Sequence, residues 1–211
     1  MDFGGHAIYR RAMKLYGNLN SGNCYKVRLL LSYLDVPFRY ENINAPAGGT
    51  RTAEFLAINP VGQIPVLTLD DDRTLAESNA ILAFLAEDTP YMPVNAFDRA
   101  KALQWMFWEQ YKHEPAIAVA RFITYYAPER ETELPGLLER GQTALAVMEG
   151  HLRSSPWFVG AGPSVADIAL YAYTHVAEEA GFELAKFPHV EAWTARMGEH
   201  PRHVLMKDMP A

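Results

Sequence analysis

Cysteine is almost absent from this 211-residue chain, which contains one, Cys24. A single cysteine excludes an internal disulfide framework and fits a reducing, cytoplasmic setting. Basic residues are also in the minority, because 19 Lys and Arg stand against 25 Asp and Glu and give a formal net charge of -6. Since the cations are scattered as well as few, we expect no nucleic-acid partner.

Several patterns that carry chemistry are missing. No stretch approaches the roughly 20 apolar residues of a membrane span, so no membrane partner is expected. The seven histidines show no metal-ligand spacing, because His113-Glu114 lacks the second His of H-E-x-x-H, and we expect no metal. There is no Gly-rich phosphate loop, and Ser21 does not lie in the G-x-S-x-G motif of serine hydrolases.

Hydrophobic residues, at 49% of the chain, suffice for a sizeable core. From residue 13 to 88 the patterns alternate between strand and helix. Leu15-Tyr16 suits a strand and Val27, Leu30 and Leu31 recur at helical spacing. The other elements are predicted as a strand over 37–43, a helix over 53–58, strands over 66–69 and 73–76, and a helix over 77–87. This βαβαββα order is that of a thioredoxin-like α/β domain.

The rest of the chain reads as all-α. Residues 89–95 form a linker, and 96–211 form an all-helical C-terminal domain. Its helices are predicted over 97–126, 135–153, 165–178 and 187–199, the third opened by a capping box at Ser164 and Asp167. Residues 1–12 are expected to be a disordered extension.

Ser21 is the central candidate for chemistry. A loop of turn residues, 17–23, brings it to a helix start, where free N–H groups and the helix dipole stabilise an anion such as a thiolate. Ser21-Gly22-Asn23-Cys24 has C-x-x-C spacing with Ser in the exposed first position, and Cys24 shares a face with apolar residues and should be buried. A plain helix cap is the alternative role for Ser21.

Four motifs in this order resemble the soluble glutathione S-transferase family over residues 13–200. They are Ser21-x-x-Cys24, the segment Asn59-Pro60-x-Gly62-Gln63-Ile64-Pro65-Val66-Leu67, Glu77-Ser78, and Ser164-x-x-Asp167. The serine at the helix start resembles the serine-using branch, with theta-like and many bacterial members. The resemblance implies a cytoplasmic homodimer that binds glutathione as co-substrate.

The resemblance also implies roles for individual residues. Ser21 would stabilise the glutathione thiolate, with Asn23 or Asn20 sharing the contact. The helix start at Glu77-Ser78 suits the ammonium and carboxylate of a γ-glutamyl group, although a plain cap is the alternative. Pro65 is expected to be cis rather than an ordinary trans proline. The implied glutathione-binding residues are Arg51, Gln63, Ile64, Pro65, Glu77 and Ser78.

The second substrate, a hydrophobic electrophile, is expected on the aromatic helix that starts near residue 97. Trp105, Trp108 and Tyr111 fall on or near one broad face, and the alternative is that this face belongs to the core. The implied electrophile-site residues are Leu19, Asn20, Trp108, Tyr111, Lys112 and Pro115.

Three functions remain open from the sequence. The first is a glutathione transferase that adds the thiolate to an electrophile. The second is a glutathione-dependent thiol–disulfide oxidoreductase or peroxidase, disfavoured because Cys24 is in the wrong position to attack. The third is a non-catalytic ligand-binding or interaction module.

Overall fold

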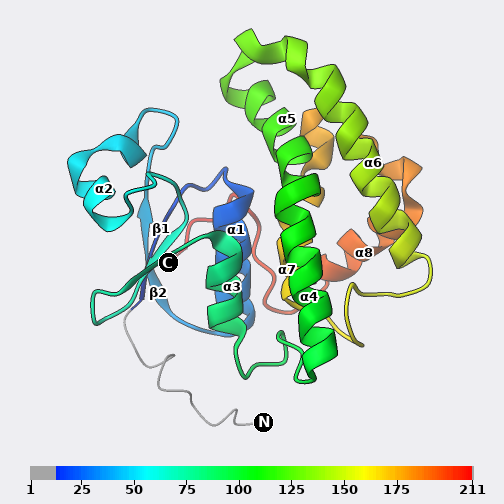
Figure 1. The fold of residues 1–211 in the computed structure, drawn as a ribbon, viewed down its shortest axis with the longest axis horizontal. Helices are drawn as coiled ribbons and strands as arrows, with labels where there is room; N and C mark the ends of the chain where they lie inside the picture. Colours follow the sequence, from blue (N-terminus) through cyan, green and yellow to red (C-terminus); the bar gives the residue numbers. More distant parts are fainter. Residues whose placement is uncertain (1–12, 211) are drawn as a thin grey trace. The chain divides into compact units, whose positions relative to one another are not determined.

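The computed structural model describes residues 13–210, whose contacts divide into two units (Figure 1). Among the described residues, 13–89 form the first unit together with 201–210, and residues 90–200 form the second. The sequence placed the segment after 200 in the helical domain, whereas its contacts are with the first unit. The predicted extension, 1–12, lies outside the described residues.

A mixed four-stranded sheet forms the centre of the first unit. The strands are β1 (Met13–Gly17), β2 (Phe38–Asn42), β3 (Val66–Thr68) and β4 (Thr74–Ala76), in the order β2-β1-β3-β4. β1 is parallel to β2 and antiparallel to β3, and β3 is antiparallel to β4. Met13, Leu15 and Gly17 of β1 are buried, as expected for alternate residues of a central strand. The predicted thioredoxin-like order is confirmed.

Three helices complete the order, α1 (Gly22–Tyr33), α2 (Ala53–Ile58) and α3 (Ser78–Ala86). α1 and α3 lie side by side (Figure 1). Val27 and Leu30 of α1 and Ile81 and Leu82 of α3 are fully buried, so the apolar stripes seen in the sequence form the core.

The segment after residue 200 runs along α1 as a strap, defined here as residues 201–210. Tyr25 donates its hydroxyl to the Val204 carbonyl at 2.8 Å, and Ser32 donates to the Arg202 carbonyl at 2.8 Å. Arg28, 2% exposed, donates from one terminal nitrogen to the Met206 carbonyl at 2.9 Å and from the other to the Asp208 carbonyl. These three α1 residues share a helical face, so the strap covers polar groups that would otherwise face solvent.

The second unit is helical, as predicted. Its helices are α4 (Ala96–Trp108), α5 (Glu114–Tyr126), α6 (Leu134–Leu152), α7 (Val165–Thr174) and α8 (Pro188–Gly198). Every residue of α7 is buried, so it is the core of this unit. The single helix predicted over 97–126 is interrupted by a π-helical turn, Glu109–His113. Such turns insert an extra residue into a helix and are frequent at functional sites.

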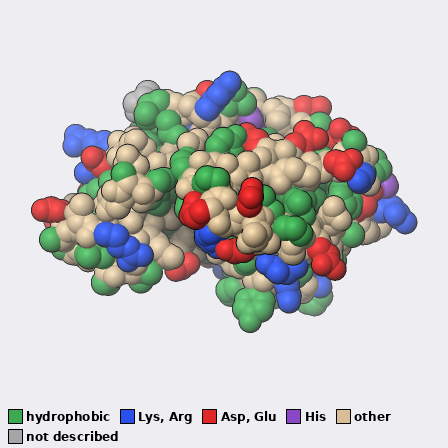
Figure 2. All heavy atoms as spheres, turned by 90° about the horizontal axis from the view of Figure 1, so that it is seen from above, with side chains coloured by type: hydrophobic (Ala, Val, Ile, Leu, Met, Phe, Trp, Pro, Cys, Tyr) green, Lys and Arg blue, Asp and Glu red, His purple; other side chains and the backbone are tan. Residues whose placement is uncertain are grey.

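The surface charge and the lengths of the helices can be compared with the predictions that no nucleic acid and no membrane are partners. On the face shown in Figure 2, Lys and Arg side chains lie singly among acidic and apolar ones. None of the helices between residues 13 and 210 is long and apolar enough to cross a membrane.

Glu149 of α6 caps the start of α8 and gives the second unit a pH-dependent contact. Its carboxylate accepts the main-chain N–H groups of His189 and Val190, both at 3.0 Å, and contacts the His189 ring. Burial acts to raise the pKa of Glu149, but these hydrogen bonds outweigh it and the net pKa is lowered. The ionised form is therefore the one that the fold stabilises.

We expect Glu149→Gln to be about 1 kcal/mol less stable than the wild type at neutral pH, because the amide is a weaker acceptor than the carboxylate. The wild-type advantage is present above the ordinary Glu pKa of about 4.3 and disappears as the pH falls through the lowered native pKa. Urea unfolding of both proteins across this range measures the difference. A difference in unfolding free energy that stays constant as the pH falls below the ordinary Glu pKa would contradict the role of the ionised Glu149 carboxylate as a cap of α8.

Candidate active site

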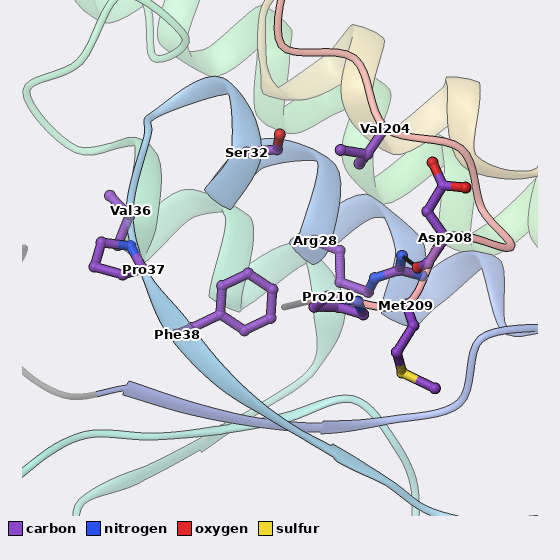
Figure 3. A pocket seen from close by; sticks show the side chains of 9 residues that line it. All are labelled: Arg28, Ser32, Val36, Pro37, Phe38, Val204, Asp208, Met209 and Pro210. Carbon is purple, nitrogen blue, oxygen red and sulfur yellow. Dashed lines mark hydrogen bonds between the residues drawn. The ribbon is translucent and has the colours of Figure 1, made fainter.

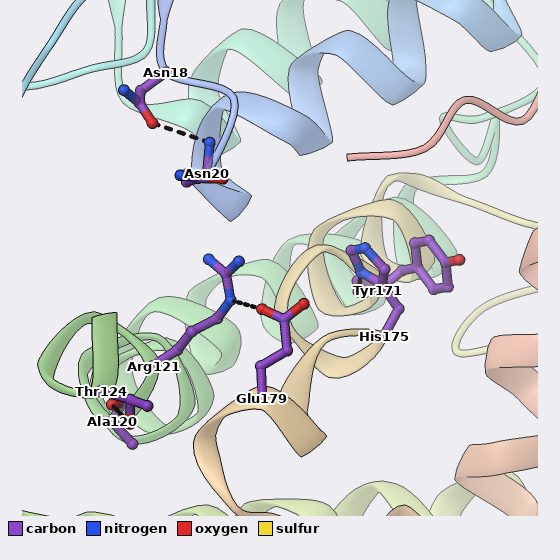
Figure 4. Close-up of polar contacts among 8 residues, drawn as sticks. All are labelled: Asn18, Asn20, Ala120, Arg121, Thr124, Tyr171, His175 and Glu179. Carbon is purple, nitrogen blue, oxygen red and sulfur yellow. Dashed lines mark hydrogen bonds and ion pairs between the residues drawn. The ribbon is translucent and has the colours of Figure 1, made fainter. Parts of the chain in front are cut away.

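Ser21 occupies the N-cap of α1, as the sequence predicted. It has extended backbone angles, φ -89° and ψ 118°, and its side-chain oxygen accepts the Cys24 N–H at 3.3 Å. The preceding loop is held by Asn18, whose Oδ1 accepts the Asn20 N–H at 2.9 Å and whose Nδ2 donates to the Ile43 carbonyl at 3.1 Å (Figure 4). Because capping uses an oxygen lone pair, it leaves the Ser21 hydroxyl hydrogen able to donate.

Cys24 is buried, which confirms the prediction from its helical face. Its exposed fraction is 0%, and burial raises the pKa of its thiol to about 11 although interactions with Ser21 and Asn18 act to lower it. At neutral pH the thiol is therefore protonated, and a protonated, inaccessible thiol is a poor nucleophile.

The start of α3 is held close to the start of α1. Glu77 is the exposed N-cap residue of α3 and has φ 67°, a left-handed conformation that costs a non-glycine residue about 1–3 kcal/mol. Ser78, buried, donates its hydroxyl to Asn23 Oδ1 at 3.3 Å. Lys26 Nζ donates to Asn79 Oδ1 at 3.2 Å. Two hydrogen bonds thus join the helix starts that carry Ser21 and Ser78.

The segment before β3 presents main-chain groups beside the Ser21 loop. Ile64–Pro65 is a cis peptide, as predicted. Val66 pairs with Tyr16, so the register places Pro65 next to Gly17 at the beginning of the loop. Between residues 13 and 210, no hydrogen bond is found to the main-chain N–H or C=O of Ile64. These groups are consequently suited to pairing with an extended ligand.

Arg51 contacts the same segment. Its Nη1 donates to the Val61 carbonyl at 3.2 Å. Gly62 has φ +67°, and a Cβ there would lie 2.5 Å from Arg51 Nη1 and 3.0 Å from the Thr50 carbonyl oxygen. Glycine at 62 thus allows the guanidinium to approach the main chain closely, next to Gln63.

Of the aromatic residues predicted to share one face of the long helix, Trp105 and Trp108 are in contact with each other, whereas Tyr111 is largely exposed. Trp105 packs against Phe158 and His151 at ring-centre distances of 4.7 and 5.0 Å. Trp108 contacts Trp105 at 5.3 Å, whereas Tyr111 is 80% exposed. The π-helical turn changes the angular offset between residues before and after position 109, so regular helical spacing fails there.

The remaining electrophile-site candidates lie in different elements. Lys112 is in the π-helical turn, with Nζ 5.5 Å from the centre of the Tyr111 ring, and Pro115 opens α5. Leu19 and Asn20 belong to the loop of the first unit.

Two polar contacts in the second unit were not predicted from the sequence. Arg121 of α5 is 7% exposed and donates to Glu179 at 2.6 Å, with its guanidinium 5.0 Å from the Tyr125 ring centre (Figure 4). His113, fully buried in the π-helical turn, contacts Thr174 Oγ1 at 2.9 Å. The pairing of an Arg on an otherwise apolar helical stripe with a distant Glu leaves no local sequence signal.

An apolar cavity of about 290 Å³ in the first unit lies away from Ser21 (Figure 3). Its walls come from the second half of α1, the start of β2 and the strap, and include Arg28, Val36, Phe38 and Met209. Ser21 lies at the opposite end of α1, so the chemistry and this cavity do not coincide. Among residues 13–210 there is no group of three or more His, Cys, Asp or Glu arranged to hold a metal.

Comparisons with known proteins agree with this arrangement. Residues 20–88 match the model of the glutathione S-transferase N-terminal domain, and residues 105–201 match that of the glutathione S-transferase C-terminal domain. A solved structure of a glutathione S-transferase from Pseudomonas fluorescens Pf-5 is similar, with 51% identity and a TM-score of 0.91 over 93% of this chain and 99% of that one.

Two curated proteins of Escherichia coli strain K12 are also similar. Disulfide-bond oxidoreductase YfcG is 30% identical over 85% of this chain and 87% of its own length. Glutathione S-transferase GstB is 28% identical over 91% of this chain and 97% of its own length.

Proposed function

Because the chain belongs to the glutathione S-transferase family, we propose that it binds glutathione and transfers its thiolate to a hydrophobic electrophile. The observation that carries this proposal is the Ser21 hydroxyl at the start of α1, with its oxygen capping the helix and its hydrogen able to donate. An ordinary thiol has a pKa near 8.5 and is mostly protonated at neutral pH, so activation requires a donor at this place.

In the proposed reaction Ser21 stabilises the sulfur anion of glutathione, and the start of α1 adds its unpaired N–H groups and positive dipole. Asn23, which faces Ser78 across the helix starts, shares the thiol contact. The thiolate then attacks an electrophilic carbon, forming a carbon–sulfur bond while the electron pair moves onto the leaving group or the activated bond.

Glutathione itself would be held by the first unit. Glu77 pairs with the γ-glutamyl ammonium, and Ser78 with the α-carboxylate at the start of α3. The main chain of Ile64, beside Pro65, pairs with the ligand backbone. Gln63 and Arg51 reach the glycyl end, where the guanidinium is suited to a carboxylate.

The electrophile is assigned to Leu19 and Asn20 of the loop together with residues of the second unit. We propose that the protein acts as a homodimer, as is typical of its family. The second-unit residues in this proposal are Trp108, Tyr111, Lys112 and Pro115.

Thiol–disulfide exchange with glutathione is the second candidate, because YfcG is a disulfide-bond oxidoreductase at 30% identity. Cys24 does not favour it, since a buried thiol of raised pKa cannot open a disulfide. Exchange in this protein would therefore proceed by attack of the Ser21-activated glutathione thiolate on a disulfide substrate, which forms a mixed disulfide with glutathione and releases one substrate sulfur as a thiolate.

Titration calorimetry with glutathione tests the binding site. Glu77→Ala and Ser78→Ala should each raise Kd about ten- to a hundredfold, because each removes a charge-assisted contact of about 1.5–3 kcal/mol. Ser32→Ala is the matched control, since it removes a hydroxyl from α1 on the strap face and should leave Kd unchanged. No binding by the wild type at millimolar glutathione would refute the proposed function.

Cys24→Ala should retain wild-type turnover with a model electrophile, because the thiol is buried and protonated. It should lower the free energy of unfolding by about 1 kcal/mol through the small cavity it leaves. Steady-state rates and thermal unfolding measure the two effects. Loss of turnover in a folded Cys24→Ala protein would favour thiol–disulfide exchange over glutathione transfer as the function.

A further inference from the structure

One hydrogen bond connects the two ends of the proposed glutathione site. Ser78 Oγ, at the start of α3, donates to Asn23 Oδ1, in the first turn of α1, at 3.3 Å. Ser78 is assigned to the γ-glutamyl carboxylate, and Asn23 lies two residues after Ser21, at the thiol end. The bond therefore links the group that recognises the substrate to a group beside the reacting sulfur.

This bond and a bound carboxylate compete for one hydrogen. A serine hydroxyl has a single hydrogen, so Ser78 cannot donate fully to Asn23 and to a carboxylate at once. The bond to Asn23 is long, since O–H···O distances in proteins cluster at about 2.7–2.8 Å. A bond to an ionised carboxylate is shorter and about twice as strong, so the ligand takes the hydrogen.

We propose, building on the function proposed above, that Ser78 and Asn23 act as a relay. Binding of the γ-glutamyl α-carboxylate draws the Ser78 hydroxyl away from Asn23, and the Asn23 carboxamide, released from Ser78, turns to donate an N–H to the glutathione thiolate. A thiol that lacks the α-carboxylate leaves Asn23 bonded to Ser78 and is activated less. Asn23 is in this way a positioning residue that makes thiol activation selective for γ-glutamyl compounds.

The surroundings of the relay stay in place while it switches. Lys26, fully buried, donates to Asn79 and keeps α1 joined to α3 independently of Ser78. Lys26, three residues after Asn23, and Glu77, next to Ser78, are charged neighbours of the relay along the chain, and both are retained in the variants below. Direct electrostatics has the opposite sign to the relay, because a nearby carboxylate by itself raises the pKa of a thiol.

The test compares glutathione with γ-aminobutyryl-cysteinyl-glycine, which is glutathione without the α-carboxylate. The pKa of each bound thiol is read from the ultraviolet absorbance of the thiolate against pH, at saturating ligand. In the wild type the analogue should have the higher thiol pKa and form about tenfold less thiolate at a pH below both pKa values. Ser78→Ala should restore thiolate formation in the analogue, because Asn23 no longer has Ser78 as its donor.

Asn23→Ala should raise the thiol pKa of bound glutathione, leave that of the analogue nearly unchanged, and so remove the excess of the analogue's pKa over that of glutathione. Where the analogue does not saturate the wild type, Asn23→Ala must still raise the thiol pKa of bound glutathione, because the relay acts through the Asn23 carboxamide, and an unchanged pKa overturns it. An analogue pKa equal to or below that of glutathione in the wild type, or no rescue by Ser78→Ala, would overturn the relay. Wild-type protein that binds no glutathione would instead overturn the proposed function.

Discussion

Ser21→Ala is expected to lower turnover with a model electrophile about ten- to a hundredfold near neutral pH. The substitution removes one hydrogen bond to the charged sulfur, worth about 1.5–3 kcal/mol, and less of the bound glutathione is then ionised. Turnover should recover as the pH rises, because the bound thiol then loses its proton without help. Glutathione affinity should change little, since Glu77, Ser78 and the main chain of Ile64 are retained.

The structure permits a control that separates the two roles of Ser21. Its oxygen caps α1 by accepting the Cys24 N–H, so Ser21→Ala also costs about 0.5–2 kcal/mol of stability. Asp is an equally good cap, but an ionised Asp has no hydrogen to donate and repels a thiolate.

Ser21→Asp should therefore be as stable as the wild type and as inactive as Ser21→Ala, while Ser21→Thr should keep both cap and activity. The pH–rate profiles of the four proteins, with their unfolding curves, measure this. Overlapping profiles for the wild type and Ser21→Ala would leave Ser21 as a helix cap only, and Asn20 or Asn23 would activate the thiol.

Asp167→Ala is expected to lower the free energy of unfolding of the second unit by about 3–5 kcal/mol. The Asp167 carboxyl, fully buried at the start of α7, accepts from the Phe158 N–H at 3.1 Å, from Trp193 Nε1 at 3.0 Å, and from the Ser164 N–H and hydroxyl at 2.9 and 2.8 Å. Removing the acceptor leaves buried donors from three chain segments without their partner. Each unsatisfied donor costs about 1–3 kcal/mol before relaxation.

The chain offers a matched control on α4. Asp98 is the third residue of α4, as Asp167 is the third residue of α7. Its N–H donates to Asn95 Oδ1 at 2.9 Å, but this pair lies on the surface. Asp98→Ala should cost about 1 kcal/mol or less, because water replaces the lost contacts. Thermal and urea unfolding of both variants compare them. Equal losses for Asp167→Ala and Asp98→Ala would mean that the carboxyl of Asp167 acts only as a local helix cap.

The sequence by itself determined the features that depend on neighbouring residues. Apolar periodicity predicted the strand and helix order of the first unit, and the run of turn residues before Ser21 predicted its place at the N-cap of α1. The capping box at Ser164 and Asp167 and the burial of Cys24 followed from spacing on a helix. Each of these is settled within one or two turns of chain, where local geometry limits the choices.

The tertiary structure decided the contacts that join distant residues. The bond from Arg28 to Met206 of the strap, the bond from Ser78 to Asn23 and the bond from Trp193 to Asp167 join residues that are 178, 55 and 26 positions apart, at spacings that no local pattern encodes. The π-helical turn, in which Glu109 and His113 are buried, was not predicted either, and it changes the angular offset of every later side chain of the helix. Arg28 is charged and yet buried, and only the fold supplies the carbonyl groups to which its guanidinium donates.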